Sequence, residues 1–279
     1  MHDYCYSCNT VEKITQKTMS QKFWQNVSTN AWEETPYPWR PCYKDLAIFM
    51  FYVLRKTTKK KDAVVLLIGA TRELRFLLSF FKIKYDLIDY SENMIAVTTP
   101  KHDASVRAIY HQDWFETIPS PTRYDVILGD LILNLIHKEG VATFFSIYRE
   151  HMAKDGFFVL RGRLLTSSSQ ETAHTAIQRQ LHTITRTSLY TLFANFQTLY
   201  TFTKGASEII LQDFIASTQN PEKKQLGIVL KNKYLNSSLS YVLHSKHELM
   251  RLPLPGLKIV HEYNPKDYLD SFAFIIYTP

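Results

Sequence analysis

Glycine, cysteine and long apolar runs are all scarce in this chain of 279 residues. With only eight glycines, each one marks a turn or a close approach of the backbone that needs it. Three cysteines are too few for a disulfide framework, and such sparse use is typical of a reducing compartment. No apolar stretch approaches the length that spans a bilayer, and the polar first twenty residues lack the apolar core of a secretory signal. We therefore expect a cytoplasmic protein with no membrane partner.

A paired set of metal ligands is also lacking. His2, Cys5 and Cys8 have the spacing of half a zinc site, but no second Cys/His pair follows at a matching distance. We interpret these cysteines as free thiols near a frayed terminus and predict no metal.

The charge balance is basic, with a formal net charge of +7 and a pI of about 9.1, which permits an acidic or nucleic-acid partner. The basic residues are dispersed except for one dense run at 55–61, RKTTKKK. This run lies between a predicted helix and the first predicted strand. A solvated connector is the favoured interpretation, and a phosphate-binding patch is the alternative.

The segment 63–91 has the pattern of a βαβ unit. The apolar run 63–68 predicts a strand buried on both faces, Gly69 ends it, and Thr71 is suited to cap the helix that follows. A second apolar run ends in Asp89, twenty positions after the glycine. In such a unit the turn presents backbone N–H groups, and a carboxylate on the next strand accepts hydrogen bonds from ribose hydroxyls. One glycine in place of three argues against a pyrophosphate and favours a nucleoside with a smaller tail, such as S-adenosylmethionine (SAM).

Strand and helix patterns alternate through this half of the chain. Helices are predicted at 43–54, 73–81, 91–100 and 138–152, and strands at 106–110, 124–130 and 157–161, with a turn at 154–156. In the helix at 73–81, Leu74, Leu77/Leu78 and Phe81 are expected to face inward. This alternation is typical of a parallel sheet covered on both faces.

The alternation stops at 164–250, where apolar residues recur at helical spacing and predict helix and loop. For the stripe Leu189, Phe193, Phe196 and Tyr200 the favoured interpretation is core packing, and a lid is the alternative. Two last strands are predicted at 257–261 and 272–277. Before the first helix, three prolines and two tryptophans in 31–41 predict a stiff, extended arm.

Five segments stand in an order that resembles the core of class I SAM-dependent methyltransferases. They are 68–74 (IGATREL), 87–94 (LIDYSENM), 112–114 (QDW), 125–130 (DVILGD) and 153–160 (AKDGFFVL). The first resembles the GAT-x-EL branch of the family, and 38–41 (PWRP) resembles an element upstream of it in the same branch. The resemblance covers most of the chain except 1–30 and 164–250.

The resemblance implies an α/β, Rossmann-like fold with a mostly parallel seven-stranded sheet flanked by helices and a helical insertion before the last two strands. A single domain would comprise an N-terminal arm and helix at 1–62, a SAM-binding core at 63–163, a helical insertion at 164–250 and a closing hairpin at 251–279.

It also implies the cofactor-binding residues. The turn Gly69, Ala70 and Thr71 would contact SAM, and the alternative for Gly69 is an ordinary turn that ends a strand. Asp89 would bind the ribose, and the alternative for it is a solvated strand end. Tyr90 and Met94 would border the adenosine, or else belong to the core.

The later motifs complete this set. Asp113 would hold the adenine amino group with Trp114 packed on the base. Gly129 and Asp130 end the strand that faces the methyl donor, where Asp130 contacts SAM, orients substrate or caps a helix.

Trp39 and Arg40 belong to the arm. The resemblance folds the arm over SAM with Arg40 as a forked donor to the methionine carboxylate, and anchoring of the arm is the alternative. His111 and His137 flank the expected pocket, where we interpret both as structural histidines.

The implied activity is methyl transfer from SAM, with S-adenosylhomocysteine (SAH) as product. The reagent is already activated, so alignment and exclusion of water suffice, and no catalytic residue is assigned. An Asn/Asp-Pro-Pro-Tyr tetrad is lacking after the fourth strand, and no cysteine is near the site, which argues against a nucleic-acid partner and leaves a small molecule or a protein group as acceptor. A non-catalytic SAM/SAH-binding regulatory or interaction module is the alternative, followed by a nicotinamide-dependent oxidoreductase.

Overall fold

The computed structural model describes residues 32–33, 35–101, 103–120, 122–166, 170–202, 206–232 and 242–279. The chain divides into two compact units. The first comprises Met1–Asp130, Thr143–Phe157 and Ser238–Ser240, and the second Leu131–Ala142, Phe158–Ser237 and Tyr241–Pro279. His2, Cys5 and Cys8 lie outside the described residues.

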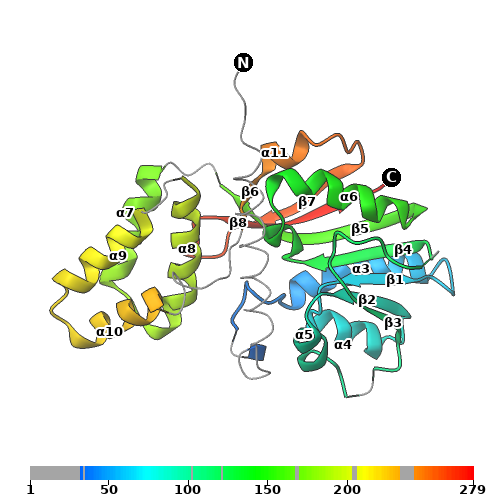
Figure 1. The fold of residues 1–279 in the computed structure, drawn as a ribbon, viewed down its shortest axis with the longest axis horizontal. Coiled ribbons are helices and arrows are strands. Elements are labelled where there is room, and N and C mark those ends of the chain that lie inside the picture. Colours follow the sequence, from blue (N-terminus) through cyan, green and yellow to red (C-terminus); the bar gives the residue numbers. More distant parts are fainter. Residues whose placement is uncertain are drawn as a thin grey trace. The chain divides into compact units, whose positions relative to one another are not determined.

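Four parallel strands form the centre of the first unit (Figure 1). In the order β3-β2-β1-β4 they are Val106–His111, Tyr85–Asp89, Val65–Ile68 and Tyr124–Asp130. Every residue of β1, β2 and β4 is buried, whereas β3 alternates between half-buried and exposed positions, as an edge strand does. Because Val65 is in register with both Tyr85 and Val126, these strands begin at one edge of the sheet and end together at the other.

Helices connect these strands, as the sequence pattern predicts. They are α3 (Tyr43–Thr57), α4 (Arg72–Phe80), α5 (Glu92–Val97) and α6 (Val141–Glu150), the last preceded by the short turns η1 (Ile132–Leu135) and η2 (Lys138–Gly140). In α4 the buried residues are Leu74, Arg75 and Leu78. The prediction that Phe81 faces inward is wrong, because α4 ends before it and 48% of its surface is exposed.

The predicted turn at 154–156 is also wrong. β5 runs without interruption over Met152–Leu165, so the helix predicted to reach 152 ends at Glu150. The glycine there has another cause: a Cβ on Gly156 would lie 2.9 Å from the carbonyl oxygen of Ala153 and 3.2 Å from that of Tyr124. Close packing, and not a turn, requires this glycine.

The second unit combines the rest of the sheet with a group of helices. Its strands are β8 (Ser271–Tyr277), β7 (Leu257–Tyr263), β6 (His244–Ser245) and β5 from Phe158 on. β8 is antiparallel to both β5 and β7, and β6 is parallel to β5. Seven strands of this eight-stranded sheet follow the order β3-β2-β1-β4-β5-β8-β7, and β6 pairs with β5 off this path, which confirms the predicted fold class.

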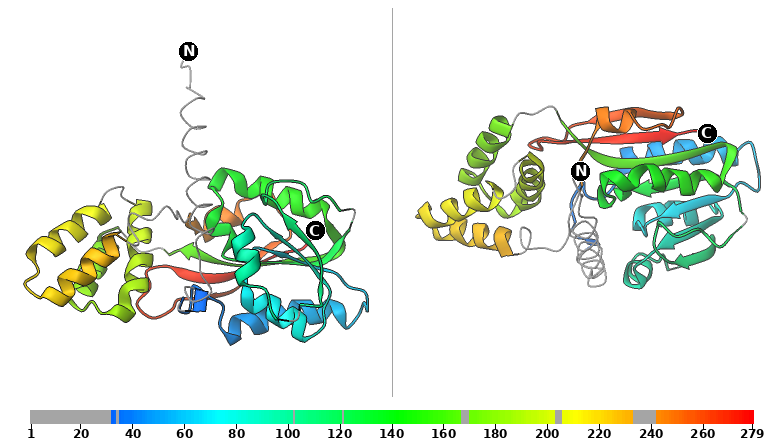
Figure 2. Two further views of the ribbon diagram at one scale, coloured as in Figure 1. Left: turned by 60° about the horizontal axis from the view of Figure 1, so that its bottom comes forward. Right: turned by 45° about the horizontal axis from the view of Figure 1, so that its top comes forward.

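The predicted helical insertion is present in this unit. It contains α7 (Gln170–His182), η3 (Arg186–Ser188), α8 (Leu189–Phe202), α9 (Ala206–Ser217) and α10 (Pro221–Leu230), and α11 (Lys246–Met250) precedes β7. α8 contacts α7, α9 and α10, and both views in Figure 2 show these helices as one group. Leu189, Phe193 and Phe196 are buried, as the core interpretation of this stripe predicts. Among the described residues, no helix combines the length and the apolar character that a bilayer crossing requires.

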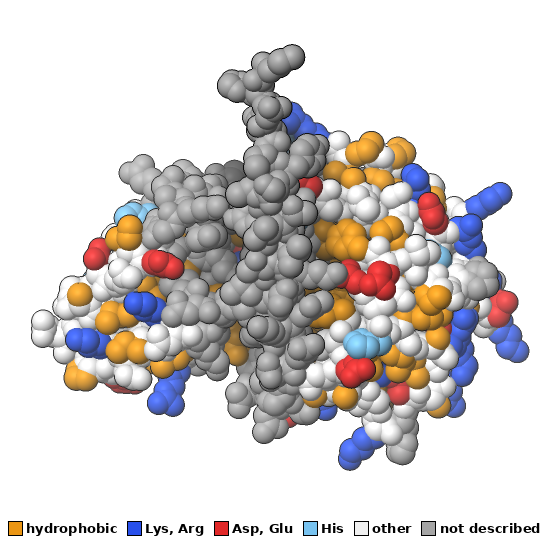
Figure 3. Space-filling model, viewed as in Figure 1, with side chains coloured by type: hydrophobic (Ala, Val, Ile, Leu, Met, Phe, Trp, Pro, Cys, Tyr) orange, Lys and Arg blue, Asp and Glu red, His pale blue; other side chains and the backbone are white. Residues whose placement is uncertain are grey.

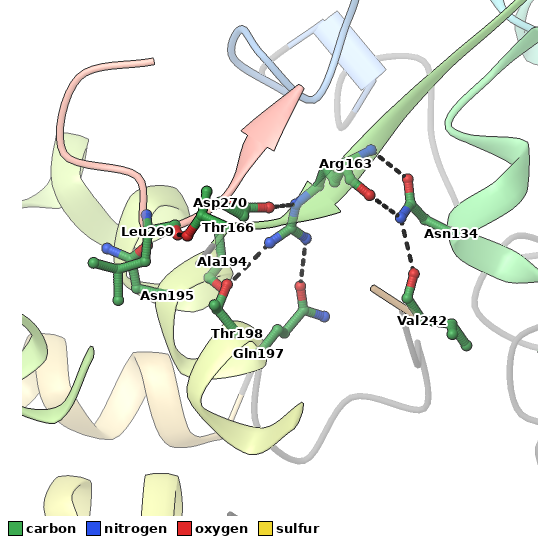
Figure 4. Close-up of polar contacts among 10 residues, drawn as sticks. All are labelled: Asn134, Arg163, Thr166, Ala194, Asn195, Gln197, Thr198, Val242, Leu269 and Asp270. Atoms are coloured by element: carbon green, nitrogen blue, oxygen red, sulfur yellow. Dashed lines mark hydrogen bonds and ion pairs between the residues drawn. The ribbon is translucent and has the colours of Figure 1, made fainter. Parts of the chain in front are cut away.

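A fully buried ion pair joins these helices to the strands (Figure 4). Arg163 on β5 donates from Nε to Asp270 at 2.5 Å, from Nη1 to Gln197 at 2.9 Å and from Nη2 to the carbonyl of Ala194 at 3.3 Å. Its backbone N–H and carbonyl bond the side chain of Asn134 at 2.8 and 2.9 Å. The charge of Arg163 is thus balanced and its donors are directed at α8, which fixes this helix against β5.

Candidate functional site

A glycine turn ends β1 at the carboxyl edge of the first unit's sheet. Gly69 has φ = 79°, in the left-handed region that side chains with a Cβ rarely adopt. Its N–H donates to the carbonyl of Ile88 at 2.9 Å, and its own carbonyl accepts from Thr71 N–H at 2.8 Å. Thr71 is the N-cap residue of α4, as predicted, but its side chain makes no capping hydrogen bond. The turn therefore delivers the chain directly into the amino end of α4, where free N–H groups favour polar or anionic ligands.

Asp89 lies at the end of β2, beside this turn. It is 5% exposed, and its two carboxylate oxygens each accept one backbone N–H, from Ala70 at 2.7 Å and from Ser91 at 2.8 Å. Burial raises the pKa of Asp89 to about 6, although these two hydrogen bonds, His111 and Arg75 oppose the rise. A carboxylate has about four acceptor positions, so about two remain for a ligand.

An aromatic pair follows at the ends of β2 and β3. The rings of Tyr90 and Trp114 meet edge to face, with centroids 5.5 Å apart. Trp114 is 7% exposed, and its Nε1–H is buried with no acceptor among the described residues. Asp113 accepts from the N–H of Phe115 at 2.9 Å, and Tyr148 donates to the carbonyl of Trp114 at 3.0 Å, which together fix the loop. An indole donor without an acceptor beside a polar loop is a place where a heterocyclic ligand fits.

Gly129 and Asp130 end β4, and Gly129 is in register with Ile68 next to the glycine turn. Asp130 is 9% exposed. Met94 is buried in α5, where its N–H donates to the capping hydroxyl of Ser91 at 3.1 Å. The structure therefore brings nine of the predicted residues to the ends of adjacent parallel strands or directly after them; they are Gly69, Ala70, Thr71, Asp89, Tyr90, Asp113, Trp114, Gly129 and Asp130.

The N-terminal arm is fastened to the first turn of α4. Arg40 donates from Nε to Glu73 at 2.6 Å and from Nη1 to the carbonyls of Trp32 and Glu33 at 3.0 and 2.9 Å. Glu33 pairs with Arg72 at 2.6 Å, and Trp39 is 7% exposed. Arg40 therefore already uses its forked donors inside the protein, and the arm lies at the helix start that follows the glycine turn.

Glu73 also lies in the first turn of α4, beside the glycine turn, and the sequence prediction left it out of the site although the GAT-x-EL motif contains it. One carboxylate oxygen, Oε1, bonds Arg40, while Oε2 is buried with no partner among the described residues. A buried carboxylate oxygen without a donor is costly unless a ligand supplies one.

Arg75, one residue further along α4 than Leu74, was also missed because a charged residue inside a helix is usually solvated. It is fully buried and donates to Asp103 at 3.1 Å, to Thr98 at 3.0 Å and to the carbonyl of Ile95 at 2.7 Å. These contacts tie α4 to α5 and so hold the ends of β1 and β2 in place.

Of the two histidines, His111 has contacts of the structural kind, and for His137 the structural interpretation stays a prediction. His111 is half exposed and bonds the carbonyl of Tyr90 through Nε2 at 2.8 Å, with Glu92 at 3.3 Å from Nδ1. His137 is the N-cap residue of η2, in the second unit. Among the residues that the structure describes, no three His, Cys, Asp or Glu side chains are grouped as a metal site would require.

Comparison with known proteins yields similarity of fold. No protein-family model matches the chain, and no curated protein sequence matches it significantly. Among solved structures, magnesium protoporphyrin IX methyltransferase from Synechocystis PCC 6803 with bound SAH is 9% identical, with a TM-score of 0.51 over 94% of this chain and 100% of that one. A Rhodobacter sphaeroides protein provisionally assigned to the Zn-dependent alcohol dehydrogenases is 13% identical, with a TM-score of 0.56 over 94% of this chain and 99% of that one.

Proposed function

We propose that this chain is a SAM-dependent methyltransferase that binds SAM at the carboxyl edge of the parallel strands of the first unit. The observation that carries the proposal is the pairing of the Gly69 turn with Asp89, whose carboxylate is buried between two backbone N–H donors and keeps about two acceptor positions. Two acceptors match the two hydroxyls of a ribose. The direction of β8 also favours SAM over a dinucleotide. β8 is antiparallel to both β5 and β7, whereas a dinucleotide-binding sheet of strand order 3-2-1-4-5-6 is parallel throughout.

The remaining residues have the roles that this ligand requires. Trp114 and Tyr90 border the adenine, and Asp113 accepts from its amino group. Met94 borders the adenosine from α5. Gly69, Ala70 and Thr71 lie against the methionine portion, with Gly129 and Asp130 at the end of β4. We add Glu73, because its unpartnered Oε2 suits the ammonium group of an amino acid.

Arg40 takes a narrower role in this proposal. Since its guanidinium is bonded to Glu73 and to two carbonyls of the arm, it orients Glu73 and holds the arm with Trp39 beside the site. Direct contact with the methionine carboxylate would require that ion pair to rearrange.

SAM, when bound, supplies a methyl group that is already activated by its sulfonium. The chain has then to bind the nucleoside, align an acceptor and exclude water, and none of these tasks requires a general base. After β4 the sequence is Leu131-Ile132 and not the Pro-Pro-Tyr of exocyclic-amine methylation, so we propose a small molecule or a protein group as acceptor.

We propose further that the helical insertion and the arm select the acceptor, because the expected SAM contacts all precede Arg163. Hydrogen exchange tests this role. Amides of α7 and α8 should exchange more slowly with SAH and acceptor together than in the free protein, and equal protection would make these helices ordinary scaffold.

Thermal unfolding with SAM, SAH and NAD tests the cofactor. A ligand at about a hundred times its dissociation constant should add about 2.7 kcal/mol to the free energy of unfolding. Stabilisation by NAD alone would contradict the proposal and favour an oxidoreductase. Stabilisation by SAM without methylated product in a substrate library would favour the non-catalytic binding module.

A further inference from the structure

The first unit carries a cluster of exposed aromatic rings in the second half of α4 and directly after it. Phe76, Phe80 and Phe81 are 57%, 66% and 48% exposed, at the end of α4 and directly after it. Phe76 and Phe80 are one helical turn apart and stack with ring centroids 6.2 Å apart, and Phe81 meets Phe80 edge to face at 5.2 Å. We call these three residues the phenylalanine cluster. Contiguous exposed hydrocarbon of this kind marks an interaction site.

Two lysines follow this cluster in the chain, and a third stands shortly before β3, the strand that pairs with β2. Lys82 directly follows Phe81, Lys84 is two positions further on, and Lys101 precedes β3. All three lysines are exposed. Lys84 donates to the carbonyl of Ala104 at 3.1 Å. The neighbouring carboxylate, Asp103, is buried and already paired with Arg75, so it does not neutralise the lysines. The segments that directly follow the cluster and precede β3 therefore carry positive charge.

The same sign continues along the amino edge of the sheet. Because the strands are parallel, the connections leading into them share this edge, and their exposed cations are Lys59, Lys61, Arg123 and Lys154. Of the carboxylates there, Asp125 is buried and paired with Lys60, and Asp155 is exposed but paired with Lys56. Asp62 and Glu150 are also exposed, and they are fewer than the exposed cations. Figure 3 shows Lys and Arg side chains along the right-hand edge of the molecule, where Figure 1 places the connection between α3 and β1.

We propose that the phenylalanine cluster and its lysines form a docking surface for an anionic lipid bilayer. A second copy of the chain is disfavoured, because a self-complementary contact would place lysine against lysine. Single-stranded nucleic acid needs open ring faces, whereas Phe76 and Phe80 turn a face toward each other. The cations that directly follow the rings in the chain are lysines, and Arg72, one helical turn before Phe76, is already paired with Glu33, so among the described residues there no arginine is unpaired for a phosphate to bind through two hydrogen bonds. Hydrocarbon ringed by hydrated point charges suits the interface between headgroups and acyl chains.

This contact needs no spanning helix and is independent of the proposed methyl transfer, and it departs from the expectation, drawn from the sequence, that the chain has no membrane partner. The surface extends from the middle of α4 to the amino edge of the parallel strands, whereas Asp89 and Asp130 lie at the carboxyl edge. Binding to a bilayer and binding of SAH should therefore be separable by mutation.

Sedimentation of the full chain with vesicles tests the surface. The protein should sediment with vesicles of phosphatidylcholine and phosphatidylglycerol, and not with phosphatidylcholine alone. Replacing Lys82, Lys84 and Lys101 with Gln should lower the partition coefficient about a hundredfold, since each lysine near an anionic surface contributes about 1 kcal/mol. Alanine at the three phenylalanines should lower it about tenfold per ring.

Matched variants in the second unit control for net charge and for apolar area. They are Lys224→Gln with Lys258→Gln and Lys266→Gln, and Ile209→Ala with Met250→Ala, all at exposed positions. These controls should bind vesicles as the unaltered chain does, and every variant should keep its affinity for SAH. Equal losses in the controls, a dimer that the Phe→Ala changes dissolve, or binding of an oligonucleotide in place of vesicles would each overturn the proposal.

Discussion

Replacing Asp89 with Ala is the most direct test of the site. About two acceptor positions of its carboxylate remain after Ala70 and Ser91 have bonded, and in the proposed complex both accept ribose hydroxyls. Hydrogen bonds to a charged group contribute about 1.5–3 kcal/mol each. The variant should therefore bind SAH more weakly by about 3 kcal/mol or more, which is a factor of at least about a hundred.

The variant should still fold, because two effects on stability oppose each other. Loss of the carboxylate leaves two backbone N–H groups without acceptors, at about 1–3 kcal/mol each. The carboxylate is itself unfavourable where it is, since burial raises its pKa from 3.8 to about 6, equivalent to about 3 kcal/mol at neutral pH. These magnitudes are similar, so we expect a small net change in the free energy of unfolding.

Calorimetric titration of SAH, with urea unfolding of the same samples, provides the assay. Asp86→Asn is the matched control: Asp86 is a buried carboxylate on the same strand, it bonds Tyr124 and Arg107, and its loss should alter stability without altering SAH affinity. Unchanged SAH affinity in folded Asp89→Ala protein would refute the cofactor assignment. An equal loss in both variants would point to a general distortion of β2.

Three further predictions concern pH, the buried ion pair and the basic run. SAH affinity should be constant above about pH 7 and should fall by up to tenfold per pH unit below pH 6, because Asp89 with its raised pKa then takes up a proton. The free energy of unfolding of the ligand-free protein should rise as the pH falls from about 6 to about 4, because the folded state binds this proton more tightly than the unfolded state. SAH titrations and urea unfolding at several pH values check the two directions. Arg163→Met should destabilise the protein by about 3–5 kcal/mol in urea unfolding, and adding Asp270→Leu should restore much of the loss, whereas two additive losses would show that the pair is not coupled. Lys60→Gln should cost at most about 1 kcal/mol through loss of its partly exposed ion pair, while Lys59→Gln should be neutral; equal effects in thermal unfolding would contradict the pairing.

The sequence by itself determined the parts of the site that depend on local chemistry. The apolar run at 63–68 with Gly69 after it predicts a strand that ends at this glycine, and the structure has this strand, with Gly69 in the left-handed region. Asp89 at the end of the second run was predictable in the same way, as was Ser91 as the cap of α5, whose hydroxyl accepts from Met94 N–H. Strand period, turn conformation and helix caps are set within a few residues, so no distant partner had to be known.

Only the tertiary structure decided where charges are buried and which glycines serve packing. Arg163 and Asp270 are 107 positions apart, and Arg40 and Glu73 are 33 apart, so nothing local to either residue indicates its partner. Gly156 has the local pattern of a turn, yet it lies inside β5, where a Cβ would meet the carbonyl of Ala153 and also that of Tyr124 from a neighbouring segment. A charged side chain is buried by groups that the fold brings from distant parts of the chain. A short window of sequence does not contain these partners, so it cannot predict the burial.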